Sequence, residues 1–199
     1  EYDLDSIDPS TQMAYGFANF SLHCPSGIDF WEKVRFDVGL RFTNHNLFGS
    51  NLDYQGLFAG MFDDQTMGYI SYSSGFNAPS LYRLYEPTAH WMSGISRGNP
   101  NLKAETSNSA EVGVKHGSEK VDLAAAMFVT LVNNGVEYVY LWDSSKDIDS
   151  LGFGDDRGDT YINLSRQLVR GFEVSGAYRM NEKISVSGNV SVLFGKIDV

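Results

Sequence analysis

The chain has 199 residues, a formal net charge of −10 and an aromatic content of 14%, with 20 glycines. The negative charge argues against binding to nucleic acid, because phosphate contacts require a basic surface. Its apolar runs fall short of the roughly 20 residues of a membrane-spanning helix, which excludes a helical membrane protein. A single cysteine, Cys24, excludes an internal disulfide.

Apolar residues recur at every second position along most of the chain, which is the pattern of half-buried strands. The clearest case is 34–42, where Val34, Phe36 and Leu40 share one face and Arg35 and Asp37 share the other. Convincing helical periodicity is absent. The predicted strands, in chain order, are 11–23, 33–44, 56–63, 67–75, 105–116, 121–141, 160–179 and 184–194.

The predicted connections alternate in length. Short turns at 63–66, 116–120 and 180–183, together with 24–32, alternate with long loops at 44–55, 76–104 and 142–159. This alternation is typical of an antiparallel transmembrane β-barrel, and we predict that all-β fold. The alternative is a soluble β-sandwich. It is less favoured because several predicted strands exceed the usual length of about five or six residues.

Four segments carry a resemblance to a known family. They are 69–85 (YISYSSGFNAPSLYRLY), 98–107 (GNPNLKAETS), 161–165 (YINLS) and 169–174 (VRGFEV). Taken in this order, they resemble the C-terminal barrel of TonB-dependent outer-membrane receptors, over about residues 68 to 196. The resemblance implies that residues 1–199 are a segment of one larger barrel domain of about 22 strands. It also implies a Gram-negative outer-membrane location, with the plug domain and the terminal strands outside this chain.

Within that family, haem and haemoglobin receptors place a histidine between a Phe-Arg-Ala-Pro box and an Asn-Pro-(Asp/Asn)-Leu box. The corresponding residues here are Phe76, Asn77, Ala78 and Pro79, then Asn99, Pro100, Asn101 and Leu102, with His90 between the two boxes. Asn77 departs from the arginine that is common in the family.

The resemblance implies a receptor and transporter, not an enzyme. It would bind haem or a haemoglobin-type haem protein at extracellular loops and import the haem. It would have no intrinsic cofactor, since haem is the transported ligand. Its other implied partners are membrane lipid and, through the plug, the TonB-ExbB-ExbD energy-coupling complex.

His90 is the candidate axial ligand, because neutral imidazole binds iron and histidine is a common haem ligand. A haem also needs flat apolar surfaces and partners for its propionates. The candidates close to His90 in sequence are Tyr82, Tyr85 and Trp91 for the macrocycle, and Arg83 and Arg97 for a propionate. His45, in the predicted loop 44–55, is a secondary candidate. The alternative is that His90 is a surface histidine and that the aromatic residues pack the loop.

A second group of residues lies in the 169–174 segment. Gly171 indicates a β-bulge or a close backbone approach, with Arg170 and Glu173 as a pair facing the barrel lumen. Ordinary strand packing is the alternative.

Other functions stay open at this point. One is a receptor of the same architecture for an iron-siderophore or another nutrient chelate. Another is a passive porin or a barrel enzyme, although the sequence has no G-x-S-x-G elbow, no HExxH and no glycine-rich phosphate loop after a strand.

Overall fold

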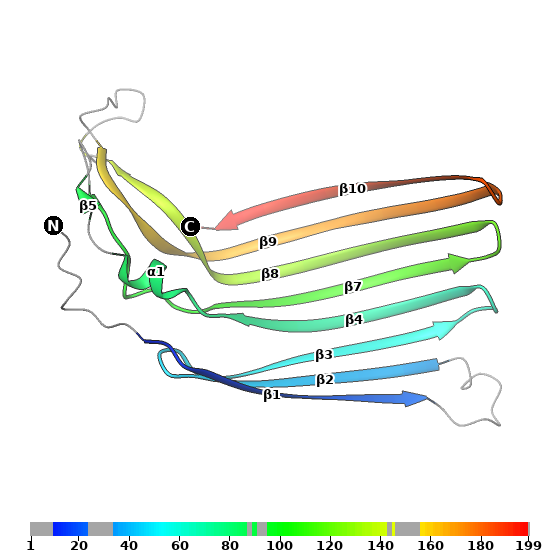
Figure 1. Cartoon of the computed structure of the whole chain (residues 1–199), viewed down its shortest axis with the longest axis horizontal. Helices are drawn as coiled ribbons and strands as arrows, with labels where there is room; N and C mark the ends of the chain where they lie inside the picture. The colour runs from blue at the N-terminus through cyan, green and yellow to red at the C-terminus, as the bar shows by residue number, and fades with distance from the viewer. Residues whose placement is uncertain are drawn as a thin grey trace.

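The chain folds into one curved antiparallel sheet of long strands (Figure 1). The computed structural model describes residues 10–23, 34–86, 89–90, 95–142, 145 and 156–198. The long strands are β1 (Met13–His23), β2 (Val34–His45), β3 (Gly49–Met61), β4 (Thr66–Asn77), β7 (Glu105–Gly117), β8 (Val121–Trp142), β9 (Asp156–Asn181) and β10 (Ile184–Asp198). These eight strands confirm the predicted number, and each pairs with its neighbour in chain order.

Three short elements lie between β4 and β7. They are the helix α1 (Leu81–Tyr85) and the two-residue strands β5 (Ala89–His90) and β6 (Ile95–Ser96). Strand β6 pairs in parallel with β9, where Ile95 lies opposite Gly158. Within the described part of the chain, no helix is long and apolar enough to cross a membrane.

The sheet has two different faces, because successive side chains of a strand point to opposite sides. The register aligns one apolar row across the sheet, which we call the apolar face. Its members include Phe36, Phe58, Ile70, Val112, Met127, Phe172 and Val192, each opposite the next. The other side, the polar face, carries Arg35, Asp37, Arg41, Asp53, Glu111 and Glu173.

Side chains of the apolar face remain exposed, with Phe42 at 52% and Met127 at 64% of their area. No second sheet covers this face among the described residues. The buried apolar cluster instead lies on the polar face and consists of Leu84, Leu102 and Val136. A β-sandwich, which buries its apolar rows between two sheets, does not match this arrangement.

The connections follow the predicted pattern with one exception. The short turns are confirmed at 62–65, 118–120 and 182–183, and they lie at one end of the sheet, which we call the turn end (Figure 1). Helix α1 lies at the opposite end, the loop end. Residues 24–33 and most of the predicted loop 142–159 lie outside the described residues.

The predicted loop 44–55 is wrong. Strands β2 and β3 are joined by a tight turn at 46–48, and Gly49 begins β3 with a φ of 74°. Leu52 and Tyr54 alternate with Asn51 and Asp53, so this stretch has the period of a strand. Its polar side chains lie on the polar face, where a strand needs no apolar residues. The prediction of a loop is wrong because it rests on these polar residues alone.

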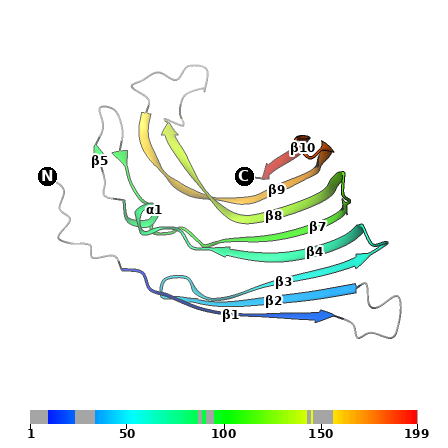
Figure 2. The ribbon, with the colours of Figure 1, turned by 45° about the vertical axis from the view of Figure 1, so that its right-hand side comes forward.

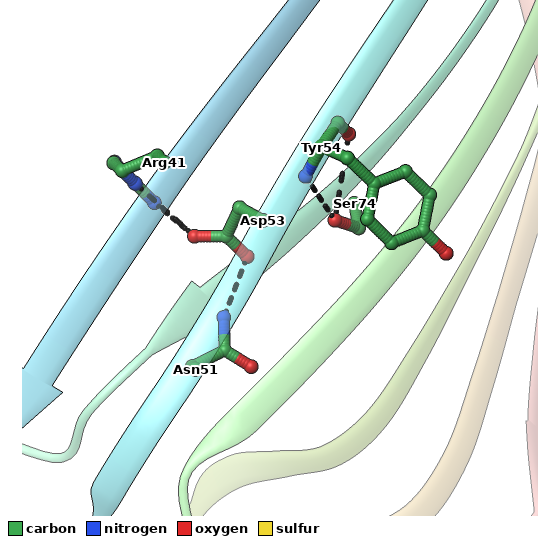
Figure 3. A network of polar contacts seen from close by, with 5 residues as sticks. All are labelled: Arg41, Asn51, Asp53, Tyr54 and Ser74. Atoms are coloured by element: carbon green, nitrogen blue, oxygen red, sulfur yellow. Dashed lines mark hydrogen bonds and ion pairs between the residues drawn. The ribbon is translucent and has the colours of Figure 1, made fainter. Parts of the chain in front are cut away.

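Asp53 joins β2 to β3 through a buried carboxylate on the polar face (Figure 3). The residue is 6% exposed. Its Oδ2 accepts hydrogen bonds from Arg41 Nη2 at 2.7 Å and Nε at 3.1 Å, and its Oδ1 accepts one from Asn51 Nδ2 at 2.9 Å. Three charge-assisted or polar donors therefore offset the cost of burying this charge.

We expect Arg41→Met to destabilise the sheet by about 1–3 kcal/mol, because it leaves the buried Asp53 carboxylate with one donor. The matched control is Arg35→Met. Its pair with Asp37 is more exposed, at 54% and 20% of the two side chains, so the loss is expected to be smaller. The measurement is the thermal unfolding midpoint of the full-length protein in detergent. Equal losses in the two variants would contradict this assignment.

Candidate functional site

The connection between β4 and β7 folds back over the polar face at the loop end, where α1 lies on the concave side of the sheet (Figure 2). We call residues 78–86 and 95–104 of this connection the platform. Leu84 and Leu102, at 3% and 4% exposed, pack against Val136 of β8. Burial of these apolar side chains holds the platform onto the sheet.

Helix α1 starts at the end of the first box. Pro79 is buried and precedes the N-cap residue Ser80, whose Oγ accepts a hydrogen bond from the Arg83 N–H at 3.3 Å. Serine at this position satisfies a backbone donor that the first helical turn leaves free. The sequence thus begins a short helix that directs Leu84 toward the sheet.

The second box ties the platform to β9. The Nδ2 of Asn99 donates to the Tyr161 carbonyl at 2.8 Å, and its Oδ1 accepts the Asn101 N–H at 3.0 Å. Leu102 then enters the buried cluster, while Pro100 is exposed. These box residues therefore have a structural role: they return the loop to the sheet.

Asn163, from the 161–165 segment, makes the next link. Its Oδ1 accepts the Lys103 N–H at 2.8 Å, and its Nδ2 donates to the Lys103 carbonyl at 2.9 Å and to the Asn134 carbonyl at 2.7 Å. Asn134 has a φ of 56°, a left-handed conformation that asparagine tolerates better than most residues. One side-chain amide thus joins the platform, β8 and β9.

Asn77, the position that departs from the family pattern, contributes a polar contact of its own. Its Nδ2 donates to Glu105 Oε2, and Glu105 Oε1 accepts the Val136 N–H at 2.6 Å. The other residues of this box lie differently: Phe76 is on the apolar face opposite Thr106, and Ala78 is partly buried.

Gly98 allows two segments of the platform to approach closely. Its N–H donates to the Glu86 carbonyl at 3.1 Å, and the next N–H, of Asn99, donates to the Arg83 carbonyl at 2.9 Å. A Cβ at position 98 would lie 2.5 Å from the Glu86 nitrogen and 2.7 Å from the Tyr85 nitrogen. Only glycine fits there without backbone movement. Its place directly before the Asn-Pro pair was the available sequence signal, but we did not predict this role.

Four of the predicted ligand-binding residues lie on the platform. Tyr82 is 60% exposed, and its hydroxyl donates to Glu86 Oε1 at 2.5 Å. This hydrogen bond is the largest cause that raises the pKa of Tyr82 to about 12. The guanidinium carbon of Arg83 lies 6.0 Å from the centroid of the Tyr161 ring.

Arg97 and Tyr85 complete this set. Arg97 is exposed, and its backbone is held by Asp159 and Thr160: its N–H donates to the Asp159 carbonyl at 3.3 Å and its carbonyl accepts from Thr160 Oγ1 at 3.0 Å. Tyr85 is partly buried against the cluster.

A cavity of about 440 Å³ lies between the platform and the β2–β3 turn. Its lining includes Leu47, Phe48, Tyr85, Pro100 and Lys103. Apolar and aromatic walls with one cationic group suit the flat part of an anionic ligand.

The predicted axial ligand is placed only by its backbone. His90 lies in β5, where it pairs with Ile95, and its side chain lies outside the described part, as does the whole of Trp91. The described residues hold no group of three or more His, Cys, Asp or Glu suited to a metal ion.

His45 is not a free ligand. It is 6% exposed, its Nε2 lies 3.0 Å from Thr11 Oγ1, and its Nδ1 accepts the Leu47 N–H at 3.1 Å. Nδ1 therefore stabilises the β2–β3 turn, and Nε2 joins it to the segment before β1.

Arg170 and Glu173 do not form the predicted lumen pair. The β8–β9 register is regular here, so Arg170 lies on the apolar face and Glu173 on the polar face. Residues three apart in a strand point to opposite sides, which the prediction overlooked. Gly171 is not in a bulge, but a Cβ there would lie 2.5 Å from the Val192 carbonyl, so the predicted close backbone approach is present.

The chain is similar in sequence to several known proteins. Residues 2–195 match the family model described as TonB dependent receptor-like, beta-barrel. The ferrienterobactin receptor of Escherichia coli is 22% identical over 96% of this chain. The vitamin B12 transporter BtuB of Vibrio vulnificus is 32% identical over 57% of it. The chain spans 26% and 16% of the length of these two relatives.

A solved structure shares the fold. The siderophore receptor PirA from Pseudomonas aeruginosa superposes with a TM-score of 0.77 and 18% identity, over 94% of this chain and 35% of that one. That protein is a large barrel receptor, and the sheet described above corresponds to part of it.

We expect Gly98→Ala to loosen the platform, because the new Cβ would collide with the backbone of α1. The matched control is Gly56→Ala, where nothing lies within 4 Å of the added Cβ. Limited proteolysis of the full-length protein in detergent should cut faster between residues 78 and 104 in Gly98→Ala than in Gly56→Ala. Equal cleavage rates would show that the approach of residue 98 to α1 does not hold the platform.

Proposed function

Because the chain belongs to the TonB dependent receptor-like β-barrel family, we propose that it forms part of a receptor that takes up an iron-siderophore chelate. Members of this family are proteins of the Gram-negative outer membrane, and this chain lies there too. The apolar face contacts lipid and the polar face lines the lumen. The matching relatives are receptors and transporters.

The main observation that supports this proposal is the composition of the platform. It puts the exposed Tyr82 and Arg97, and Arg83 over Tyr161, at the loop end of the polar face. Ferric siderophores are bulky chelates that often carry negative charge, and guanidinium groups and aromatic rings bind such anions. In an outer-membrane barrel the long loops are extracellular and the short turns periplasmic. The platform would then meet the chelate outside the cell.

The relatives support a siderophore ligand more than haem. Two of those compared are receptors named for siderophores or their iron complexes. The vitamin B12 transporter carries a different metal chelate, so a broader class of chelates is consistent with the same architecture.

Haem is the second candidate, and His90 supports it. This histidine stands between the two boxes, and its backbone lies beside the platform through the pairing of β5 with β6. Tyr82, Tyr85 and Trp91 would flank the macrocycle, and Arg83 or Arg97 would meet a propionate.

Transport needs no covalent chemistry under either ligand. The TonB-ExbB-ExbD complex, acting through a plug, would weaken the binding site and shift the population toward an open path. The family match over residues 2–195 favours a receptor over a passive porin or a barrel enzyme.

We expect the full-length protein in detergent to bind a ferric tris-catecholate, measured by quenching of tryptophan fluorescence. Arg97→Gln should weaken this binding about 5- to 10-fold, since roughly 1–1.4 kcal/mol is the net value of one exposed hydrogen bond. His90→Ala should leave it unchanged. Lys120→Gln, at the turn end, is the matched charge control and should have no effect.

The same variants distinguish haem binding from siderophore binding. A haemin titration that gives a shifted Soret band, lost in His90→Ala and kept in Lys120→Gln, would replace the siderophore proposal with the haem one. Absence of binding to both ligands would contradict both.

A further inference from the structure

Three basic residues occupy neighbouring register positions on the apolar face near the loop end. In the β9–β10 ladder, Arg170 lies opposite Phe194, Lys196 lies opposite Leu168, and Arg166 lies opposite Asp198. Lys196 is therefore a diagonal neighbour of both arginines, about 7–8 Å away between backbones. Their long side chains can reach one common group. We call Arg166, Arg170 and Lys196 the basic cluster.

The cluster carries excess positive charge. Other arginines of the sheet are neutralised by the protein: Arg41 pairs with Asp53, and Arg179 with Asp122. By contrast, no salt bridge joins Arg170 to any residue of the described chain. Lys196 Nζ lies 2.8 Å from Asp198 Oδ1, with 73% of the lysine side chain exposed. Three positive charges against one negative leave a net positive charge on a surface that is otherwise apolar.

The depth of the cluster follows from the apolar rows on either side. The row of β10 runs from Val186 to Phe194 and that of β8 from Leu123 to Leu131. Each matches the roughly 9–11 residues that a tilted strand needs to cross the hydrocarbon core. Starting from the turn end, both rows end at the level of the basic cluster. Lys196 comes next on β10 after Phe194.

This position fits the boundary between hydrocarbon and headgroups. An arginine at the bilayer midplane of a barrel costs about 2–4 kcal/mol, but about 0–1 near the interface, where the side chain can extend into the polar layer. Phe194, beside Arg170, is 57% exposed and fits the aromatic girdle found at that level.

We propose that the basic cluster binds the phosphorylated headgroup of an anionic lipid in the outer leaflet. Guanidinium groups bind phosphate oxygens in a bidentate manner, and Lys196 adds a point charge between them. The headgroup would neutralise the excess charge, and its acyl chains would lie along the apolar rows of β8 and β10. The site lies on the opposite side of the sheet from the platform and does not depend on the transported ligand.

The test is native mass spectrometry of the full-length protein with added diphosphorylated lipid A. In the triple variant Arg166→Gln/Arg170→Gln/Lys196→Gln, we expect the amount of bound lipid to fall by about 5-fold or more, because the charge-assisted contacts are lost. Lys183→Gln, a charge control at the turn end, should retain as much as the wild type. Equal retention by the triple variant and the wild type would overturn the proposal.

Further controls separate loss of lipid binding from loss of folding and from loss of one particular side chain. Removing charge from a lipid-facing surface should not impair folding, and the unfolding midpoint of the variant in detergent checks this. Arg170→Lys preserves the charge and should retain most of the lipid; a loss as large as in the triple variant would contradict an electrostatic site. Displacement of the lipid by an equal concentration of inorganic phosphate would show a free-phosphate site instead, and would also overturn the proposal.

Discussion

Completion of backbone hydrogen bonds is the constraint on which the rest of this structure depends. In lipid no water is present to pair with a free N–H or carbonyl, so strands are stable there only when they form a continuous ladder with their neighbours. The β8–β9 ladder illustrates this, because it runs from Val121 and Tyr178 to Trp142 and Asp156. Where the ladder is interrupted, side chains supply the missing partners. Ser74 Oγ accepts the Tyr54 N–H at 2.9 Å beyond the end of the β3–β4 pairing (Figure 3).

The same ladder sets the alternation of side chains. It thereby gives the sheet two surfaces with different functions. One surface keeps large apolar residues exposed, as suits contact with acyl chains. The other carries the buried Asp53 carboxylate, which pairs with Arg41, and the platform at its loop end. Under our proposals, cargo binds on the second surface and lipid headgroups bind at the rim of the first. The hydrogen bonds of Asn99 and Asn163 explain how the long connection between β4 and β7 is held in a fixed place over the lumen.

Alternation allowed the strands to be predicted from sequence, because a period of two is a local property. It continues through 44–55, and the loop predicted there is wrong because it rests on the polarity of Asn51 and Asp53, which belong to the lumen side of a strand. The predicted lumen pair of Arg170 and Glu173 is wrong for the opposite reason: it disregards alternation, which puts residues three apart on opposite faces. The two boxes predicted that the connection between β4 and β7 carries the ligand-binding residues. Their physical role depends on contacts about 60 residues apart, such as that of Lys103 with Asn163, and no local pattern encodes these.

The central claim is that the sheet has a lipid-facing and a lumen-facing side. It is tested most directly by spin labels on single cysteines at positions 36 to 42 of β2, in the full-length protein with Cys24→Ser, reconstituted in lipid. We predict that accessibility to oxygen peaks at Phe36, Val38, Leu40 and Phe42, and that accessibility to a water-soluble nickel complex peaks at Asp37, Gly39 and Arg41. A flat profile, or low access to oxygen at Phe36, Leu40 and Phe42, would mean that this row is buried against protein and would contradict the account.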